Sequence, residues 1–266
     1  MAALSRVLAD SGANIISSDQ FSSDPRGGHF SLRMEFYLPQ AQLALPGLDE
    51  RLRALQPRFE LDYRLVDATR PKRVAIFVSR EDHCLLDLLW RWRRAQLAME
   101  VTAVISNHPD LEEEVTRFEV PFHHIPVSRG QKAEAEAAQL ELVAGQVDLI
   151  ILARYMQILS PDFLARVAAP VINIHHSFLP AFAGANPYER AFDRGVKLIG
   201  ATAHYVTEEL DEGPIIEQDV ERVSHRARAE ELRQVGSDIE RRVLARAVAW
   251  QLEDRVILHG HRTIVF

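Results

Sequence analysis

The 266-residue chain contains 47% hydrophobic and 26% charged residues, which is ordinary for a soluble globular protein. Its formal net charge of −7 argues against a broad basic surface for nucleic acid or for an anionic membrane, and no apolar run reaches the length of a membrane helix. A single cysteine, Cys84, excludes an internal disulfide and a cysteine metal cluster, and the first residues lack the pattern of a signal peptide. We therefore expect a cytoplasmic protein with no nucleic-acid partner and no membrane partner.

Residues 1–67 are predicted to form a small α+β unit. Apolar residues recur at helical spacing over 3–8, and two strand-like runs follow at 14–22 and 29–38 on either side of a turn. A second amphipathic helix is expected at 45–59 and a short strand at 61–67. The segment 68–72 is charged and contains a proline, so it is the best candidate for a linker.

Residues 73–266 are predicted to form one larger domain, because apolar strands alternate with helices along them. Strands are expected at 73–79, 101–106, 122–127, 147–153, 170–175, 197–206 and 213–223. Helices are expected at 84–97, 111–117, 133–145, 159–167 and 186–192, with a long last helix from about Ser237 to Gln251. Such alternation is typical of a doubly wound α/β fold with a mostly parallel sheet, whose active site lies beyond the carboxyl ends of the strands.

The run INIHHSFLP (172–180) places polar groups at the end of an apolar strand. Side chains alternate between the two faces of a strand, so Asn173 and His175 should point the same way, and His176 the other way. An amide donor beside an imidazole suits the polarisation of a carbonyl group. The alternative is a polar strand end that only caps neighbouring backbone, and for His176 a structural role is the simpler interpretation.

Two other stretches are candidates for the same site. The turn DEGP (211–214) between two apolar strands can hold the carboxylate of Asp211 at the mouth of a cleft, although an ordinary turn aspartate would look the same. The stretch LARYMQILS (152–160) passes from a strand into a loop rich in apolar groups. It could cradle a flat heteroaromatic ring, or it could simply be core.

These motifs carry a family resemblance. NIHHSFLPAF, ARYMQILSP and GATAHYVTEELDEGPIIEQ resemble the formyltransferase family that acts on 10-formyltetrahydrofolate. RVAIFVSREDHCLLDLLWRW and FAGANPYERAFDRGVKLIGATAHYV are more similar to its formyltetrahydrofolate deformylases than to its glycinamide ribonucleotide transformylases. The resemblance covers 73–266, and it implies a formyltransferase-like sheet. Residues 1–67 resemble the small ferredoxin-like ACT regulatory domain that precedes the deformylase domain.

The resemblance implies a function and a set of site residues. The reaction would be hydrolysis of 10-formyltetrahydrofolate to formate and tetrahydrofolate, supplying formate for purine synthesis and balancing the one-carbon folate pool. No cofactor and no metal would be needed. The implied catalytic residues are Asn173, His175 and Asp211, and the implied folate pocket consists of Met156, Gln157, Ile158, Leu159, Leu164 and Leu210. The alternatives are a formyltransferase with an amine acceptor and a folate-binding protein without turnover.

The chemistry of deformylation agrees with these residue types. Hydrolysis of an N-formyl group requires that water is deprotonated, that the oxyanion is stabilised and that the departing nitrogen is protonated. Asp211 can act as the base or orient the water, Asn173 can donate to the oxyanion, and His175 can supply a second donor and the proton. His204 either lines the pocket or belongs to the sheet. Cys84 is not expected to be a nucleophile.

The ACT-like region departs from its family's pattern. An ACT domain opens with a strand and a ligand-binding turn before its first helix, whereas this chain begins inside that helix. ACT domains commonly pair with one another, so we expect a homo-oligomer. Small amino acids are the implied effectors, and the missing strand and turn lead us to expect a weak or absent response to them.

The stretch VSREDHCLL (78–86) concerns the acceptor of the formyl group. The ribonucleotide transformylases carry a glycine-rich phosphate-binding turn at this place. Here there is no glycine, and Glu81 and Asp82 would repel a phosphate, although Arg80 could attract one. We therefore expect water rather than an amine to accept the formyl group.

Overall fold

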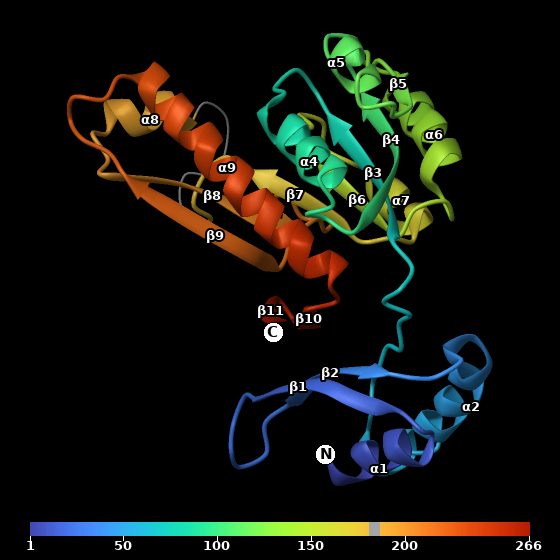
Figure 1. Ribbon diagram of the computed structural model, residues 1–266. Helices are drawn as coiled ribbons and strands as arrows, with labels where there is room; N and C mark the ends of the chain where they lie inside the picture. The colour runs from blue at the N-terminus through green and yellow to red at the C-terminus, as the bar shows by residue number, and fades with distance from the viewer. Residues whose placement is uncertain (181–186) are drawn as a thin grey trace. The chain divides into compact units, whose positions relative to one another are not determined.

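The computed structural model describes residues 1–180 and 187–266, which divide into two compact units (Figure 1). Met1–Arg70 together with Phe266 form the first unit, and Pro71–Val265 form the second. The boundary between Arg70 and Pro71 lies within residues 68–72. None of the helices in the described part of the chain combines the length and the apolar character needed to span a bilayer.

The first unit consists of a two-stranded antiparallel sheet and three helices, of which the first two contribute to its apolar core. Its elements are α1 (Ala2–Asp10), β1 (Asn14–Ser22), β2 (Phe30–Tyr37), α2 (Ala41–Arg53) and α3 (Gln56–Phe59). A small apolar core forms where Leu8 of α1 meets Leu48 and Leu52 of α2. The helix–hairpin–helix order agrees with the order of the predicted elements.

The predicted strand at 61–67 is wrong. These residues form no strand, although Tyr63 and Leu65 pack against the core of this unit and the hydroxyl of Tyr63 donates to a carboxylate oxygen of Asp49 at 2.7 Å. A strand requires a hydrogen-bonded neighbour, and β1 and β2 pair only with each other among the described residues. Apolar alternation alone was therefore not sufficient to form one. The assignment of this unit as an ACT domain stays a prediction.

The second unit is built on a seven-stranded sheet with the order β5-β4-β3-β6-β7-β8-β9. The strands from β5 to β7 run parallel, and β8 and β9 are antiparallel to their neighbours. Their bounds are β3 (Lys72–Val78), β4 (Met99–Ser106), β5 (Phe122–His124), β6 (Leu149–Leu152), β7 (Val171–His175), β8 (Leu198–Tyr205) and β9 (Ile215–Arg222). The predicted α/β class and the mostly parallel sheet are confirmed.

Helices cover both faces of this sheet (Figure 1). Apolar residues of α4 (His83–Arg93) and α9 (Ala229–Leu252) lie in one buried cluster, and those of α6 (Lys132–Val143) and α7 (Pro161–Val167) lie in the other. The remaining elements are α5 (Glu112–Thr116), α8 (Pro187–Asp193) and a hairpin formed by β10 (Val256–His259) and β11 (Arg262–Val265). The arrangement is doubly wound, as predicted.

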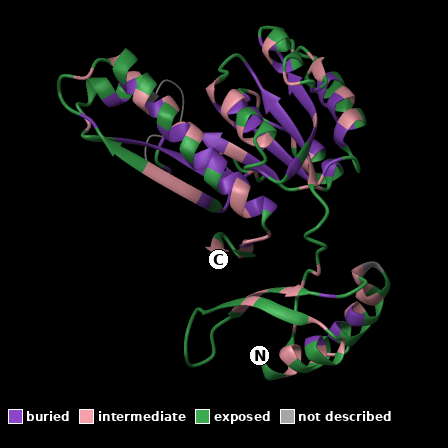
Figure 2. Cartoon of the chain, viewed as in Figure 1, coloured by how far each residue is buried: buried purple, intermediate pink, exposed green. Residues whose placement is uncertain are grey.

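The central strand β3 shows why the sequence forms such a sheet. Val74, Ile76 and Val78 face the cluster of α4 and α9, whereas Ala75 and Phe77 face the cluster of α6 and α7. Side chains on both faces are buried, so the strand is continuously apolar. Figure 2 shows that burial is concentrated in the inner strands and on the inward side of α9.

The last helix begins earlier than predicted. It starts at Ala229, eight residues before the predicted start at Ser237, and the carboxylate of Glu231 accepts a hydrogen bond from the Arg228 backbone nitrogen at 2.7 Å. The helix therefore continues through Gly236, although glycine weakens helices. A glycine is required at this position, since a Cβ atom there would come within 2.0 Å of the Tyr188 hydroxyl.

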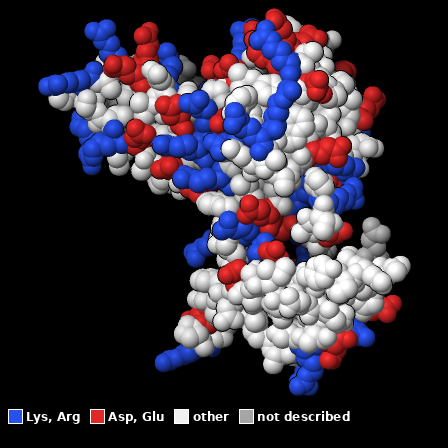
Figure 3. All heavy atoms as spheres, viewed as in Figure 1, with Lys and Arg blue, Asp and Glu red and all other residues white. Residues whose placement is uncertain are grey.

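Charges of both signs are mixed on the visible surface of the second unit (Figure 3). Between α9 and β9, Arg242 pairs with Glu221 at 3.2 Å, and Arg246 pairs with Asp219 at 2.8 Å. Such mixing differs from the one-sided basic face that nucleic acid requires.

Candidate active site

The end of β7 places the first two candidate residues side by side. Ile172 and Ile174 lie in the cluster under α4 and α9, so Asn173 and His175 point to the opposite face of the sheet, as strand alternation predicts. Asn173 is half-buried and His175 is buried. The adjoining motif continues into residues 181–186, which lie outside the described residues.

Asp211 approaches His175 from the turn between β8 and β9. Its Oδ1 lies 3.3 Å from His175 Nδ1. Asp211 adopts a left-handed backbone conformation with φ 59°, and Gly213 lies so close to the main chain of β8 that a Cβ atom would sit 1.7 Å from the Tyr205 carbonyl oxygen. This turn chemistry folds the carboxylate back over the end of β7.

His204 completes the group from the neighbouring strand β8. It faces Asn173 in the strand register, and its Nε2 lies 3.2 Å from Asn173 Nδ2. Its Nδ1 lies 2.9 Å from the Tyr205 carbonyl oxygen, which can only accept, so Nδ1 carries the proton. Nε2 is then the acceptor for the Asn173 amide. This arrangement fixes which end of the amide is the nitrogen.

The protonation states follow from these contacts. The hydrogen bond from His175 holds the pKa of Asp211 below its usual value, so Asp211 is ionised at neutral pH. Burial lowers the pKa of His204, which agrees with a neutral ring. His175 Nε2 is buried and has no hydrogen-bond partner among the described residues. The site therefore holds a carboxylate bound to an imidazole whose second nitrogen is unengaged.

The prediction that His176 points away from His175 is wrong. The two rings stack, with centroids 5.2 Å apart and planes 27° apart. The reason is that β7 ends at His175, so the alternation of the strand does not extend to the next residue. Burial, followed by the charge of Arg154, lowers the pKa of His176 to about 4. His176 is therefore neutral at physiological pH.

The predicted folate-pocket residues fall into two groups. Met156, Ile158 and Leu210 expose 57%, 59% and 62% of their surface, and Gln157 is half-buried. These side chains could contact a ligand directly. Leu159 is buried and Leu164 is partly buried, and both pack with the cluster of α6 and α7, so they support the loop from beneath.

The loop that carries Met156 is tied to the ends of β3 and β4. The backbone nitrogen of Met156 donates to Ser79 Oγ at 2.9 Å, and Ser79 Oγ donates to Asn107 Oδ1 at 2.7 Å. Ser79 and Asn107 are buried. These bonds fix the path of the loop without using the exposed apolar side chains.

His83, Cys84 and Glu240 form the one set of described residues whose donor atoms, all within 4.8 Å of one another, could hold a metal ion. Burial raises the pKa of the Cys84 thiol, so it is protonated and is neither a ready metal ligand nor a nucleophile. The guanidinium of Arg154 already lies 3.5 Å from Glu240 Oε2 and would repel a cation there. The donor set therefore does not fit a metal.

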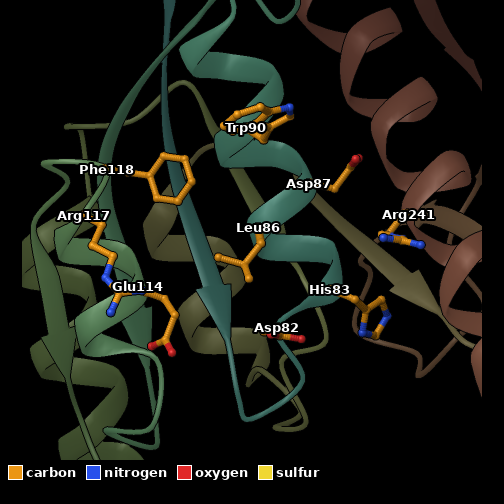
Figure 4. Close-up of a pocket in the computed structure, with 9 residues that line it drawn as sticks. All are labelled: Asp82, His83, Leu86, Asp87, Trp90, Glu114, Arg117, Phe118 and Arg241. Atoms are coloured by element: carbon orange, nitrogen blue, oxygen red, sulfur yellow. The ribbon is translucent and has the colours of Figure 1, made fainter.

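A separate cavity of about 570 Å³ lies beside α4 (Figure 4). Residues of α4, of the segment from α5 to β5 and of α9 line it: Asp82, His83, Leu86, Asp87, Trp90, Glu114, Arg117, Phe118 and Arg241. None of the predicted catalytic or folate-pocket residues is among them. The candidate active site is therefore the group at the end of β7.

Comparisons with known proteins identify the family of the chain. The family model described as formyl transferase matches residues 72–248. A formyltetrahydrofolate deformylase of Mycobacterium bovis is 59% identical over all of this chain and 86% of its own length, and one of Bacillus subtilis is 54% identical over all of this chain and 89% of its own. The chain belongs to the formyltetrahydrofolate deformylases, within the formyl transferase family.

Solved structures place the deformylase fold next to that of the transformylases. A formyltetrahydrofolate deformylase from Pseudomonas syringae superposes with a TM-score of 0.93 at 47% identity, covering all of this chain and 89% of its own. A glycinamide ribonucleotide transformylase from Symbiobacterium toebii superposes with a TM-score of 0.70 at 28% identity, covering 77% of this chain and 98% of its own. The chain therefore shares its fold with both groups over the part that each match covers.

Sequence reasoning left one residue of the candidate site open and did not single out three residues near it. The role of His204 was left open, because its partner Asn173 lies on another strand. Arg154, Tyr188 and Glu240 were not singled out. They lie far apart in the sequence, and the stretches around them gave no reason to group them. Glu240 alone could have given a signal, because it is an acidic residue at a buried position of a long amphipathic helix.

Proposed function

We propose that this protein hydrolyses 10-formyltetrahydrofolate to formate and tetrahydrofolate. The observation that carries the proposal is the contact between Asp211 Oδ1 and His175 Nδ1 at the end of β7, with the Asn173 amide oriented beside it by His204. The relatives named as formyltetrahydrofolate deformylases support the same substrate and the same reaction.

The proposed mechanism begins with the transfer of a proton from water. Asp211 orients the imidazole of His175 through Nδ1, and the proton moves from water to the unengaged Nε2 as the oxygen attacks the formyl carbon. Asp211, ionised and bound to Nδ1, stabilises the imidazolium that forms. The His175–Asp211 pair therefore performs both orientation and proton storage.

The tetrahedral intermediate is then stabilised and broken down. Asn173 Nδ2 has two hydrogens; one is directed at His204, and the second donates to the developing oxyanion. The imidazolium of His175 returns its proton to the N10 nitrogen as the carbon–nitrogen bond breaks. Formic acid and tetrahydrofolate leave, the acid loses its remaining proton to the solvent and becomes formate, and the pair returns to its starting state. In this scheme none of the steps uses a cofactor or a metal.

The folate would bind along the loop after β6. Met156 and Ile158 offer exposed apolar side chains there, and Leu210 offers another from the segment that leads to Asp211. Apolar groups of this kind suit the flat pteridine ring, while polar backbone groups fix its orientation. Leu159 and Leu164 support that wall, and Gln157 lies between Met156 and Ile158 in the chain.

The second candidate function is formyl transfer to an amine. The structural match with the glycinamide ribonucleotide transformylase favours it as the alternative. The two reactions share the activated formyl group and differ in the nucleophile. Arg80, Glu81 and Asp82 follow β3 in place of a glycine-rich turn, which supports water as the nucleophile.

The test is an incubation with 10-formyltetrahydrofolate in the absence of any amine. The proposal expects formate and tetrahydrofolate in equal amounts, and it expects millimolar glycinamide ribonucleotide neither to accelerate nor to compete with formate release. Accumulation of formylated ribonucleotide would establish the transferase instead. Substrate binding without product would establish a folate-binding protein.

We further propose a regulatory role for the first unit, together with self-association. In its sheet β1 and β2 each have one neighbour among the described residues, which leaves strand edges available for pairing. Glycine and methionine are the effectors to test, and we expect a weak or absent response, so neither should give a clear shift in melting temperature. The released formate would supply reactions that consume formate, such as purine synthesis.

A further inference from the structure

A buried charged cluster covers the carboxyl ends of β3 and β6. The sheet extends from β3 through β4 in one direction and from β6 through β7 in the other, so β3 and β6 form the switch point at which open α/β sheets accept ligands. Arg154 follows β6 directly at this point, and its carbonyl oxygen accepts a hydrogen bond from the Ser79 nitrogen at the end of β3 at 3.3 Å.

Four side chains make up this arginine cluster: Arg154, Glu240, His83 and Tyr188. Glu240 Oε2 lies 2.8 Å from His83 Nε2 and 3.5 Å from Arg154 Nε, and Glu240 Oε1 accepts from the Tyr188 hydroxyl at 2.6 Å. They come from α4, α8, α9 and the loop after β6. The protein's own side chains therefore occupy the position where this fold ordinarily receives a ligand.

Arg154 pairs with Glu240, but the protein holds it in an unfavourable state. Its backbone has φ 64°, a left-handed conformation that is unfavourable for any residue with a Cβ atom. Its Nε and Nη1 atoms are buried and have no hydrogen-bond partner among the described residues, which is costly for a charged group. Glu240 already accepts two hydrogen bonds without it. Strain and unsatisfied donors of this kind are typical of functional positions.

The His176 ring lies between the Tyr188 ring of the arginine cluster and the ring of the proposed catalytic His175. The His176 ring stacks on His175 at 5.2 Å and lies 6.3 Å from the ring of Tyr188. Any acceptor that entered at the switch point would have to occupy the space of the guanidinium. A small amine is mostly protonated at neutral pH, and the fixed positive charge of Arg154 would repel it as well.

We propose that the arginine cluster is the specificity-determining element that reserves the space beside His175 for water. This inference rests on the proposed hydrolysis. With water, a carbon–oxygen bond replaces the bond from the formyl carbon to N10, and formate leaves. With an amine, a carbon–nitrogen bond forms instead, the amine loses a proton, N10 gains one, and a formamide leaves. Arg154 excludes the second route by its volume and its charge.

Arg154→Gly tests this inference, because glycine adopts the left-handed conformation without strain and opens the space. The probe is glycinamide, a small primary amine, added to full-length protein with 10-formyltetrahydrofolate. The measured quantity is the ratio of formylglycinamide to formate, which does not depend on how much enzyme is folded. We expect this ratio to rise at least about tenfold over wild type, the smallest discrimination that pocket shape ordinarily gives.

Two further variants make the test specific. The double variant Arg154→Gly with Glu240→Gln removes both charges, so it leaves no buried carboxylate without its cation. Its ratio of formylglycinamide to formate should rise as in Arg154→Gly. Arg129→Gly removes an exposed arginine from the turn after β5, which the proposed site does not use, so the wild-type ratio should persist. Millimolar guanidinium should fill the space in Arg154→Gly and lower the ratio again.

Results that overturn this inference differ from the result that would refute the proposed hydrolysis. A wild-type ratio in both folded Arg154 variants would overturn the inference, and so would a loss of all turnover in folded protein, since Arg154 would then act in the chemistry. Unfolding of both variants would assign the cluster to stability and overturn it too. Absence of formate from the wild-type protein would instead refute the proposed hydrolysis.

Discussion

Asn173 and His204 face each other across β7 and β8, with 3.2 Å between the amide nitrogen and the imidazole Nε2. The carbonyl of Tyr205 fixes the tautomer of His204, and this tautomer fixes the amide of Asn173. An oxyanion donor must be oriented before the reaction to be effective, because reorientation during it costs free energy. His204 supplies that orientation from outside the reacting group.

Replacing His204 by phenylalanine therefore should lower turnover and leave folate affinity nearly unchanged. The ring volume is kept, but the acceptor for the Asn173 amide is lost, and a misplaced donor costs up to about a hundredfold in rate. His204→Gln offers an oxygen acceptor and should retain more activity than His204→Phe. Steady-state kinetics measure both variants, and full turnover in His204→Phe would refute the orienting role.

Removing the charge of Asp211 should have a larger effect. Asp211→Asn cannot stabilise an imidazolium at His175, so turnover should fall roughly 10²–10⁴-fold while folate still binds. Glu212→Gln is the matched control, since it neutralises the exposed neighbouring carboxylate and should leave turnover unchanged. Retention of more than about a third of wild-type turnover in Asp211→Asn would contradict the role of Asp211 in stabilising the imidazolium of His175.

Removal of the oxyanion donor should lower turnover by a defined factor. Asn173→Ala removes the amide altogether, and we expect turnover to fall on the order of 10²–10³-fold. The decrease should appear in kcat rather than in KM, because the hydrogen bond forms in the transition state. Comparison of the two kinetic constants measures this, and a change confined to KM would assign Asn173 to substrate binding.

The pKa of His176 predicts how stability changes with pH. That pKa falls from an ordinary 6.5 to about 4 in the folded protein, so between these values the unfolded state binds more protons. The free energy of unfolding is therefore unaffected by this group above about pH 6.5. It falls as the pH decreases toward 4, by up to about 1.4 kcal/mol per pH unit. The lowered pKa of His204 acts in the same direction. The lowered pKa of Asp211 also makes the protein less stable on acidification, but only at a lower pH.

Melting temperatures at neutral pH and at about pH 5 measure this effect. Wild-type protein should lose more stability on acidification than His176→Gln, which has no imidazole to charge. His225→Gln removes an exposed histidine and should behave as wild type does. An equal loss in all three proteins would show that His176 does not contribute.

The first unit carries a prediction about assembly. Within the described residues, β1 and β2 pair only with each other, and strand edges of this kind favour association. Light scattering of the full chain should therefore show a homo-oligomer, and deletion of 1–67 should weaken it. A full-length monomer at all accessible concentrations would refute this.

The parts of the fold that could be predicted are those governed by local pattern. Continuous apolar runs predicted the parallel strands, and strand alternation predicted that Asn173 and His175 share a face. The turn at Asp211 followed from its residues alone. Each of these signals lies within a few neighbouring positions, so one sequence is enough to read it.

The parts that could not be predicted depend on contacts between distant segments. The need for a glycine at Gly236 inside α9 depends on how Tyr188 packs there, and a strand at 61–67 would need a neighbour to pair with. The stacking of His176 on His175 depends on where β7 ends. The arginine cluster joins residues of α4, α8 and α9 whose charges balance only in three dimensions.

The most direct test of the central claim is the fate of the oxygen atom of water. When the protein acts on 10-formyltetrahydrofolate in water enriched in heavy oxygen, without any amine, the account predicts that each formate released carries one labelled oxygen atom from the attacking water. Mass spectrometry of the formate measures this. Unlabelled formate, or no formate until an amine is added, would contradict hydrolysis at the His175–Asp211 pair.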